Sequence, residues 1–192
     1  MRISDLITED NIEIAAELSD KDEAIERLIR LQRDSGGIRD MDSFRHAVNE
    51  RENQGSTAMS GRIAIPYARC HDLASPRITV VTVKDGVPFN APDKRPVRLI
   101  FLIAGDKDTD EHLMLRTRLQ RLLLDTDFTA RLIASSSKEE FIALIKERED
   151  RRFPVSTRPL NPLYDCSKFL NKNNKKKRRR LPRLFHRKKR DG

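Results

Sequence analysis

Hydrophobic residues recur along the first three quarters of the chain with the spacings of short strands and amphipathic helices. A β-branched run at residues 78–83 and a mostly apolar run at residues 97–104 predict two strands, the second buried on both faces. Shorter apolar segments at residues 11–18 and 63–66 predict two more strands. Residues 84–86 (Lys-Asp-Gly) predict a turn after the first of these runs.

Helical periodicity appears between these strands and after the last of them. The expected helix starts are Ser19 or Asp20, Asp42 or Ser43, Thr109, Phe128 and Ser137. Most of these residues have a side-chain oxygen that can accept a hydrogen bond from the first helical turn. Ser137 is followed three residues later by Glu140, which forms the pattern of a capping box. The order of helices and strands predicts an α/β layered domain.

Charge divides the chain into two parts. Residues 151–192 hold 16 Lys or Arg residues against two acidic residues, a net charge of +14, which leaves −5 for residues 1–150. The second part also contains four prolines, at positions 154, 159, 162 and 182, which exclude a long regular helix. We therefore expect one folded domain at residues 1–150, followed by a Pro-containing linker and a disordered, Lys/Arg-rich tail at residues 151–192.

Neither an export signal nor a membrane span is predicted. There is no apolar run of about 18 residues, and residues 1–6 lack the apolar core of a signal peptide. Cys70 and Cys166 are the two cysteines, and reduced thiols are the better interpretation of such a pair. We expect a cytoplasmic protein, with a peripheral position at the membrane as the alternative.

Two neighbouring segments contain the chemically informative residues. Residues 51–57 read Arg-Glu-Asn-Gln-Gly-Ser-Thr, and residues 63–69 read Ile-Ala-Ile-Pro-Tyr-Ala-Arg. They resemble the active-site segment of the type-2 enzyme IIA domains (fructose, mannitol and nitrogen branches) of the bacterial phosphotransferase system. Those domains read approximately R-E-x-x-G-S-T and then G-I-A-I-P-H, where the His carries the phosphoryl group. Tyr67 stands at that position.

The resemblance covers roughly residues 4–148 and implies a mixed sheet of about five strands with helices on both faces. In that family a second His near the phosphorylated one helps to hold the phosphoryl group, and His112 matches its position. Other matching or adjacent residues are expected to form a cleft for phosphate or a protein partner. These residues are Arg51, Glu52, Gly55, Ser56, Thr57, Pro66 and Arg69.

The replacement of His by Tyr67 changes what this cleft could do. An imidazole has a reference pKa of about 6.5, so a neutral lone pair is available near neutral pH, whereas a phenol has one of about 10 and is almost fully protonated. A phosphate ester of tyrosine is also a poorer donor than a phosphoramidate. Of the other histidines, His71 follows four residues later, about 13 Å away along an extended chain. This leaves His112 as the alternative acceptor.

Each of these residues also has a purely structural interpretation. Tyr67 would fill the site and close the cleft, and His112 would be an ordinary residue of a first helical turn. Arg51 and Glu52 would form an ion pair of little energetic value at a helix end. Residues 55–57 would be a turn, since no phosphate-loop pattern surrounds them.

The tail is a candidate for polyanion binding. Its basic residues of interest are Lys175, Lys176, Lys177, Arg178, Arg179, Arg180, Arg183, Arg187, Lys188, Lys189 and Arg190. Such a block attracts phosphates without regard to sequence, and the interspersed Leu and Phe residues also suit an anionic membrane. RNA, DNA and lipid therefore all stay open, as does a solubilising tail with no fixed partner.

These observations favour a regulatory, enzyme IIA-like protein that binds protein partners and is not itself phosphorylated. One alternative is an active phosphoryl carrier of the sugar or nitrogen phosphotransferase system that uses His112. Another is a module that binds nucleic acid or an anionic membrane through the tail. No cofactor is expected, and no metal site, because the scattered His and Cys residues lack the spacing of metal ligands.

Overall fold

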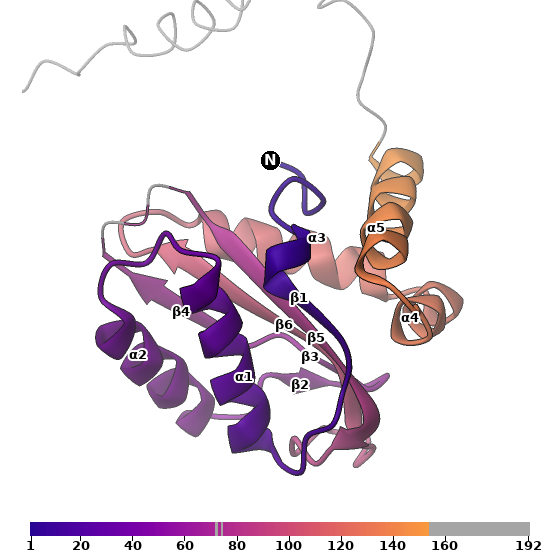
Figure 1. The fold of residues 1–192 in the computed structure, drawn as a ribbon, viewed down its shortest axis with the longest axis horizontal. Coiled ribbons are helices and arrows are strands. Elements are labelled where there is room, and N and C mark those ends of the chain that lie inside the picture. The colour runs from indigo at the N-terminus through magenta and orange to yellow at the C-terminus, as the bar shows by residue number, and fades with distance from the viewer. Residues whose placement is uncertain (72, 74, 154–192) are drawn as a thin grey trace, which may run out of the picture. The chain divides into compact units, whose positions relative to one another are not determined.

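A computed structural model of the chain describes residues 1–71, 73 and 75–153. This part contains a six-stranded mixed sheet with helices on both faces, as Figure 1 shows. The strands are β1 (Ile12–Ala16), β2 (Ala58–Met59), β3 (Ile63–Ala64), β4 (Tyr67–Cys70), β5 (Arg77–Val87) and β6 (Val97–Asp106). The helices are α1 (Lys21–Asp34), α2 (Met41–Asn53), α3 (Glu111–Leu123), α4 (Thr126–Ile133) and α5 (Lys138–Arg152), and Glu9–Asn11 form the short 3-10 helix η1. The α/β prediction is confirmed.

The sheet is arranged around β6. Its strand order is β1-β5-β6-β3-β2, and β4 also pairs with β6. β5 is antiparallel to β6, whereas β3 and β4 run parallel to successive parts of β6 along its other side. Pro66 separates β3 from β4; it has no N–H to donate, but its carbonyl accepts a hydrogen bond from Ile103 N at 3.0 Å. The sheet has six strands where about five were expected from the resemblance. Four strands were predicted along the sequence; β2 is additional, and the segment near Pro66 forms two short strands, β3 and β4, in place of one.

The predicted turn at residues 84–86 is wrong. β5 continues through these residues to Val87, and the pairing with β6 changes register between Thr82 and Val87. Gly86 has a φ of +83°, which a glycine adopts easily and which marks the bend. The Lys-Asp-Gly sequence thus produces an irregularity within a strand, since pairing with the buried β6 extends the strand past it.

Two of the predicted helix starts are confirmed, and three are displaced. Asp20 caps α1 by accepting from Glu23 N at 2.8 Å, and Ser137 caps α5 by accepting from Glu140 N at 3.2 Å. α2 begins one residue before the expected Asp42, because Asp40 accepts from Ser43 N at 3.0 Å. The cap of α3 is Asp110 rather than Thr109, and its side chain makes no capping hydrogen bond. α4 begins at Thr126 and not at the expected Phe128, because Asp125 accepts from Asp127 N at 3.1 Å and from Phe128 N at 3.0 Å.

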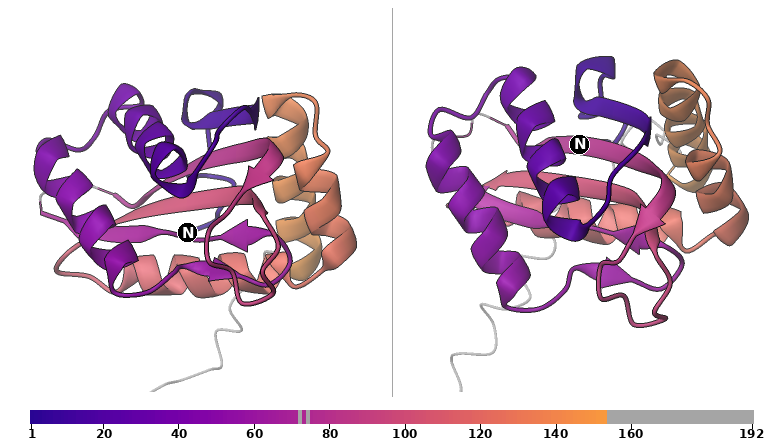
Figure 2. Two further views of the ribbon diagram at one scale, coloured as in Figure 1. Left: turned by 90° about the horizontal axis from the view of Figure 1, so that it is seen from below. Right: turned by 60° about the horizontal axis from the view of Figure 1, so that its bottom comes forward.

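The helices cover the two faces of the sheet, as the two views of Figure 2 show. α1 and α2 lie on one face, and their apolar residues form one hydrophobic cluster. Residues of α3, α4 and α5 form a second cluster on the other face. Successive residues of β6 alternate between them: Phe101 and Ile103 join the second cluster, and Leu102 and Ala104 join the first. β6 is therefore buried on both faces, as its sequence predicts. None of the helices in the described residues is sufficiently long and apolar to cross a membrane.

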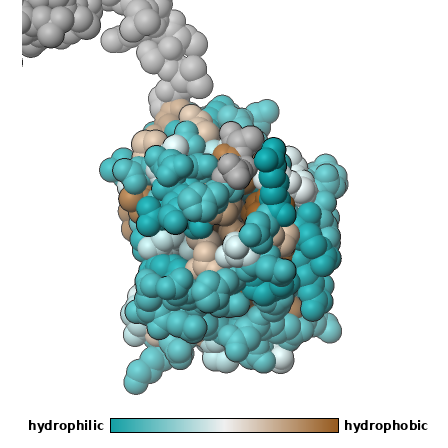
Figure 3. All heavy atoms as spheres, turned by 90° about the vertical axis from the view of Figure 1, so that its left-hand side faces the viewer, coloured by the Kyte–Doolittle hydropathy of each residue, from teal (hydrophilic) through white to brown (hydrophobic). Residues whose placement is uncertain are grey.

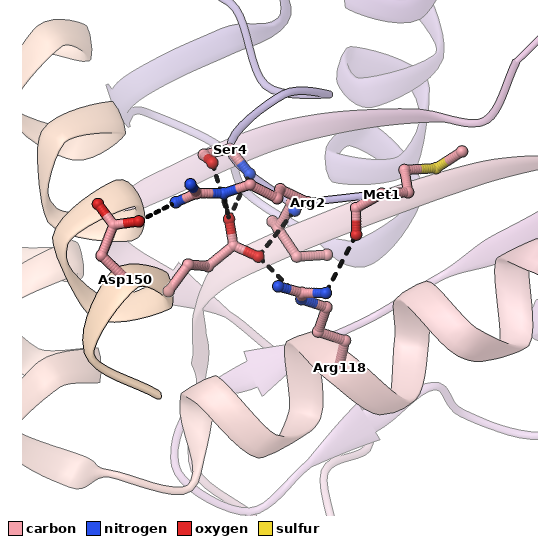
Figure 4. Close-up of polar contacts among 7 residues, drawn as sticks. Met1, Arg2, Ser4, Arg118 and Asp150 are labelled. Carbon is pink, nitrogen blue, oxygen red and sulfur yellow. Dashed lines mark hydrogen bonds and ion pairs between the residues drawn. The ribbon is translucent and has the colours of Figure 1, made fainter. Parts of the chain in front are cut away.

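A buried carboxylate connects both ends of the domain (Figure 4). Glu149 of α5 is fully buried and accepts hydrogen bonds from Ile3 N and Ser4 N at 2.9 Å, and from Ser4 Oγ at 2.7 Å. Arg118 of α3 donates to the same carboxylate at 2.9 Å, and Arg2 Nε lies 3.6 Å from it. The carboxylate therefore holds the N-terminal segment, α3 and α5 together.

These contacts also set the protonation of Glu149. Burial would raise the pKa of its carboxyl group, but the hydrogen bonds from Ser4 and Ile3 and the positive charge of Arg118 outweigh burial, so the pKa is lowered. A lowered pKa in the folded state contributes stability that is present above the pKa of the unfolded chain. That contribution disappears as the pH falls through the folded-state pKa.

We predict that Glu149→Ala lowers the free energy of unfolding at neutral pH by about 3–5 kcal/mol, because it leaves buried donors and the Arg118 charge without a partner. Urea unfolding followed by circular dichroism measures this loss. The difference from the unsubstituted chain should shrink at acidic pH, where the carboxylate becomes protonated.

Glu147→Ala is the matched control on the same helix. Glu147 is half exposed and pairs with the exposed Arg151, so its loss should cost less than about 1 kcal/mol. Equal losses for the two variants would show that the Glu149 network does not hold the domain together.

Candidate functional site

The position of Tyr67 is set by the parallel pairing of β4 with the C-terminal part of β6. Tyr67 is opposite Ile103, and Arg69 is opposite Gly105. Because side chains alternate along a strand, Ala68 and Cys70 point into the cluster beneath α1 and α2. Tyr67 packs against the other cluster, on the side of α3.

The ring of Tyr67 is surrounded by cationic and aromatic groups. The guanidinium carbon of Arg51 lies 4.7 Å from the ring centroid, and that of Arg116 lies 5.2 Å from it. The ring of His112 stacks on Tyr67 with a centroid distance of 5.9 Å and an interplanar angle of 25°. Guanidinium groups at these distances are attracted to the electron-rich face of the ring. Three side chains from α2 and α3 thus hold the Tyr67 ring in place.

His112 is in the first turn of α3 and is 3% exposed. It packs directly against Gly105 of β6, where an added Cβ would lie only 2.5 Å from the Cβ of His112. Its Nδ1 is buried and makes no hydrogen bond with any described residue. Glycine at position 105 is therefore what allows the imidazole to approach the sheet beside Tyr67.

The pKa of His112 is lowered, first by burial and then by the positive charge of Arg69. The backbone of Thr109 and the carboxylate of Asp110 act in the opposite direction. The neutral imidazole is thus the favoured form at the pH where ordinary histidines titrate.

Tyr67 borders a cleft of about 560 Å³ between α2, β4 and the segments that follow β4 and β6. Its charged lining residues are Arg39, Asp40, Glu50, Arg51, Arg69 and Lys107, and His71 also lines it. Lys107 Nζ lies 3.3 Å from His71 Nε2. Figure 3 looks onto the side of the molecule where α2 and β4 lie, and this side is mostly hydrophilic. The excess of cationic groups makes the cleft suitable for an anionic group of a ligand or partner.

Only part of the predicted residue set lines this cleft. Tyr67, Arg51 and Arg69 do, whereas the remaining predicted residues do not. Pro66 and His112 are buried beside it, and Gly55 is exposed next to the Arg51 side chain, which donates to the Gly55 carbonyl at 3.0 Å. The proposed tail residues lie outside the described residues.

The Glu52 carboxylate is buried and has structural partners. It accepts from Thr57 N at 3.0 Å and from Thr57 Oγ1 at 2.6 Å, and Lys21 Nζ lies 3.3 Å from it. Ser56 Oγ donates to the Phe89 carbonyl at 2.5 Å. These contacts fasten the segment after α2 to α1 and to the residues after β5. Glu52, Ser56 and Thr57 thereby support the loop that positions Arg51.

Several residues at the site are not among those predicted. Arg116 follows His112 by four residues on α3, so the helical spacing could have identified it. His71 was expected to lie too far along the chain to share a location with Tyr67, yet both line one cleft. Lys107 and Arg39 come from distant segments, and no local sequence signal brings them to the cleft.

Similarities to known proteins agree with this geometry. Residues 5–148 match the family described as "Phosphoenolpyruvate-dependent sugar phosphotransferase system, EIIA 2". The fructose-specific EIIA component of Haloferax volcanii is 32% identical over 123 residues, which cover 62% of this chain and 78% of that protein. The fructose-specific EIIABC component of Bacillus subtilis is 29% identical over 150 residues, 78% of this chain. That region is 24% of the Bacillus protein, so the chain spans about a quarter of this relative's length.

Solved structures share the fold. The nitrogen regulatory protein IIA-Ntr of Neisseria meningitidis superimposes with a TM-score of 0.68 at 26% identity, covering 74% of this chain and 98% of that chain. Enzyme IIA for mannitol of Escherichia coli, in its complex with phosphorylated enzyme IIB, gives a TM-score of 0.65 at 23% identity and covers 73% and 97%.

The layered sheet and the cleft beside β4 place the described residues in the class of enzyme IIA-like α/β domains. The family match over residues 5–148 gives the assignment within that class. The chain belongs to the EIIA type-2 family of the phosphoenolpyruvate-dependent sugar phosphotransferase system.

We predict that the imidazole of His112 titrates below the ordinary range for histidine, and that Arg69→Gln raises its pKa by removing a nearby positive charge. Nuclear magnetic resonance of the His112 ring protons over a pH series measures both effects. Arg30→Gln is the control, because Arg30 is exposed on α1 and distant in sequence from the site. An unchanged His112 pKa in Arg69→Gln would contradict the described electrostatics.

Proposed function

We propose that this EIIA domain is a regulatory homologue that binds protein partners of the phosphotransferase system and does not accept a phosphoryl group. The single observation that carries this proposal is Tyr67, which follows Pro66 where the family motif has its phosphoacceptor His. A phenol, with a reference pKa of about 10, is a much weaker nucleophile near neutral pH than the neutral nitrogen of an imidazole. The relatives named as fructose-specific and mannitol-specific are components of that system, which supports a role for this domain beside the partner proteins of the same system.

The contacts of Tyr67 support a binding role. Arg51 and Arg116 lie against the ring, and His112 stacks on it, so groups that could surround a phosphate are instead packed around an aromatic side chain. Arg69 and Lys107 still line the adjacent cleft. The arrangement therefore keeps a cationic surface for a partner's acidic or phosphorylated group.

The main alternative is a working carrier that uses His112. Its imidazole is 3% exposed, packs against Gly105 and is covered by the Tyr67 ring. A nucleophile must reach an incoming phosphoryl group along an open line of approach. The burial of His112 therefore favours a supporting role for it, beneath Tyr67, and not the role of acceptor.

The partner class follows from the family. In a solved complex, the mannitol enzyme IIA of Escherichia coli is bound to phosphorylated enzyme IIB. We propose that an equivalent partner surface of this chain centres on Tyr67 and Arg69 and that the protein acts in the cytoplasm. The domain would comprise residues 1–150, and the tail would be a separate functional unit.

The tail carries a second candidate function. Residues 168–190 contain 13 Lys or Arg residues and no acidic residue, and such a block binds polyanions by releasing their counterions. We propose that it attaches the domain to nucleic acid or to an anionic membrane surface.

We predict that incubation with phosphoenolpyruvate, enzyme I and the histidine phosphocarrier protein adds no phosphoryl group, as measured by intact mass. Tyr67→His should gain one acid-labile phosphoryl group, because Arg51 and Arg116 already lie against this position and Arg69 lines the adjacent cleft. Tyr67→Phe is the matched control and should stay unlabelled. Near-stoichiometric labelling of the unsubstituted chain would refute the regulatory proposal, and fragment masses would then identify His71 or His112 as the acceptor.

We predict that the full chain binds RNA or anionic vesicles with an affinity that falls steeply with increasing salt concentration. Truncation after Phe153 should remove this binding without changing the melting temperature. This end point retains α5 and the contact of Arg118 with the Phe153 ring, 4.4 Å from the guanidinium carbon to the ring centroid. Binding that survives the truncation would place the polyanion site on the domain.

A further inference from the structure

The two ends of α3 border different surfaces. Its first turn carries His112, beside Tyr67, whereas its last turn borders a groove of about 990 Å³ between α3, α4 and the segment from β2 to β3. The apolar lining residues of this groove include Met59, Ile63, Leu123, Leu124, Ala130 and Ile133. A space of this size with apolar walls accommodates several side chains of a partner, whereas a single ion would leave it largely empty.

One apolar side chain in the lining of this groove is largely exposed to solvent. Leu124, the C-cap residue of α3, is 75% exposed. A single exposed Leu is ordinary on a protein surface. Here it lines the same groove as Met59 and Ile133, which are only partly buried, so a partner that filled the groove would cover all three side chains.

The charged residues that line the groove are all positive. Arg62, Arg95, Arg98 and Arg121 line it, and its lining contains no acidic residue. None of the four forms an ion pair with a carboxylate in the described part of the chain. The cleft beside Tyr67 differs in this respect, since Asp40 and Glu50 are part of its lining.

Two acidic residues close to the groove have other contacts. Asp125, between the lining residues Leu124 and Thr126, accepts hydrogen bonds from the first turn of α4 and forms an ion pair with Arg148. Asp93 accepts hydrogen bonds from Gly61 N at 2.9 Å and from Arg95 N at 3.2 Å. It therefore connects the turn between β2 and β3 to the segment before β6. It offsets part of the positive charge of Arg95. Arg98 Nε donates to the Val83 carbonyl at 3.2 Å, so the terminal guanidinium nitrogens of Arg98 are available for a ligand together with the guanidinium groups of Arg62 and Arg121.

The rim of the groove is ordered before any partner arrives. Arg62 has a φ of +66°, a left-handed conformation that is uncommon for a residue with a side chain. Its carbonyl accepts hydrogen bonds from Arg98 N at 2.9 Å and from Leu99 N at 3.1 Å, which stabilise this conformation. A rim fixed in advance lowers the conformational cost of binding.

We propose that this groove binds an acidic amphipathic helix of a partner protein. Its apolar face, with side chains at positions i, i+3 or i+4 and i+7, would contact Leu124, Ile133 and the rest of the floor. Its flanking carboxylates would accept paired hydrogen bonds from the guanidinium groups of Arg62, Arg98 and Arg121. The proposal depends on the complementarity of charge and shape at this end of α3 and is independent of phosphorylation at the Tyr67 cleft.

The test uses the full, isotope-labelled chain and a synthetic peptide of roughly 18 residues, about five helical turns, with Leu on one face and Glu on the flanks. A scrambled peptide of the same composition controls for attraction to the basic tail. A peptide with Gln in place of Glu isolates the contribution of charge. Backbone amide shifts report where each peptide binds.

We expect the amphipathic peptide to shift the amides of residues 59–63 and 123–134 and to bind about tenfold more tightly than the scrambled or Gln peptide. Leu124→Ser and Arg121→Glu should each weaken binding about tenfold. The matched controls, Met114→Ser and Arg30→Glu, change an exposed apolar and an exposed basic residue that do not line the groove, and should change binding by less than about twofold.

Three outcomes would overturn the proposal. Equal binding of the scrambled peptide would assign the interaction to the tail. Shifts confined to residues around Tyr67 would assign it to the cleft. Anionic vesicles are the third probe. If the chain binds them more tightly than the amphipathic peptide, and this binding is lost in Arg121→Glu but unchanged in Leu124→Ser, the groove recognises charge alone. None of these results depends on whether the chain accepts a phosphoryl group, so the two proposals fail independently.

Discussion

The pairing of the short strand β4 with the end of β6 is the constraint on which the candidate site depends. It places Tyr67 on the side of α3 and aligns Arg69 with Gly105. Because residue 105 is glycine, α3 can bring His112 against the sheet beside the Tyr67 ring. Pro66 precedes this pairing and still contributes its carbonyl to β6. A shift of β4 by one residue would turn Tyr67 into the opposite core, since neighbouring strand residues face opposite sides.

Under the proposed function, this domain separates two properties that a phosphocarrier of the family combines. The ability to take a phosphoryl group depends on the side chain at position 67, whereas the ability to bind depends on the surrounding cationic groups. Arg51 and Arg116 remain close to position 67 even though a phenol occupies it. The supporting contacts of Glu52 with Thr57 keep the Arg51 segment in place. Under this proposal, a single substitution removes phosphoryl transfer and leaves the binding surface in place.

Whether a feature could be predicted from the sequence depends on how far apart along the chain the interacting residues lie. Helix caps such as Asp20 and Ser137 depend on residues three positions away, and the buried strand β6 has a continuous apolar run, so both could be predicted locally. The prediction of a turn at residues 84–86 was wrong because pairing with β6 extends β5 through a segment whose local sequence favours a turn. The Glu149 network joins residues nearly 150 positions apart, and the approach of Lys107 and His71 to one cleft depends on the sheet. The family motif identified Tyr67 and Arg51, but it could not show that the Glu52 carboxylate is used inside the fold.

The proposal that Tyr67 leaves a cleft which binds but does not accept phosphate is tested most directly by phosphorus-31 magnetic resonance. The phosphorylated histidine phosphocarrier protein is mixed with the full chain, in which Tyr67 and Tyr164 are the two tyrosines and are labelled with carbon-13. The predicted result is a shift of the Tyr67 ring signal while the phosphohistidine signal of the partner persists at its spontaneous rate of decay. Rapid loss of that signal, with a new phosphoramidate or phosphate-ester signal on this chain, would contradict the account.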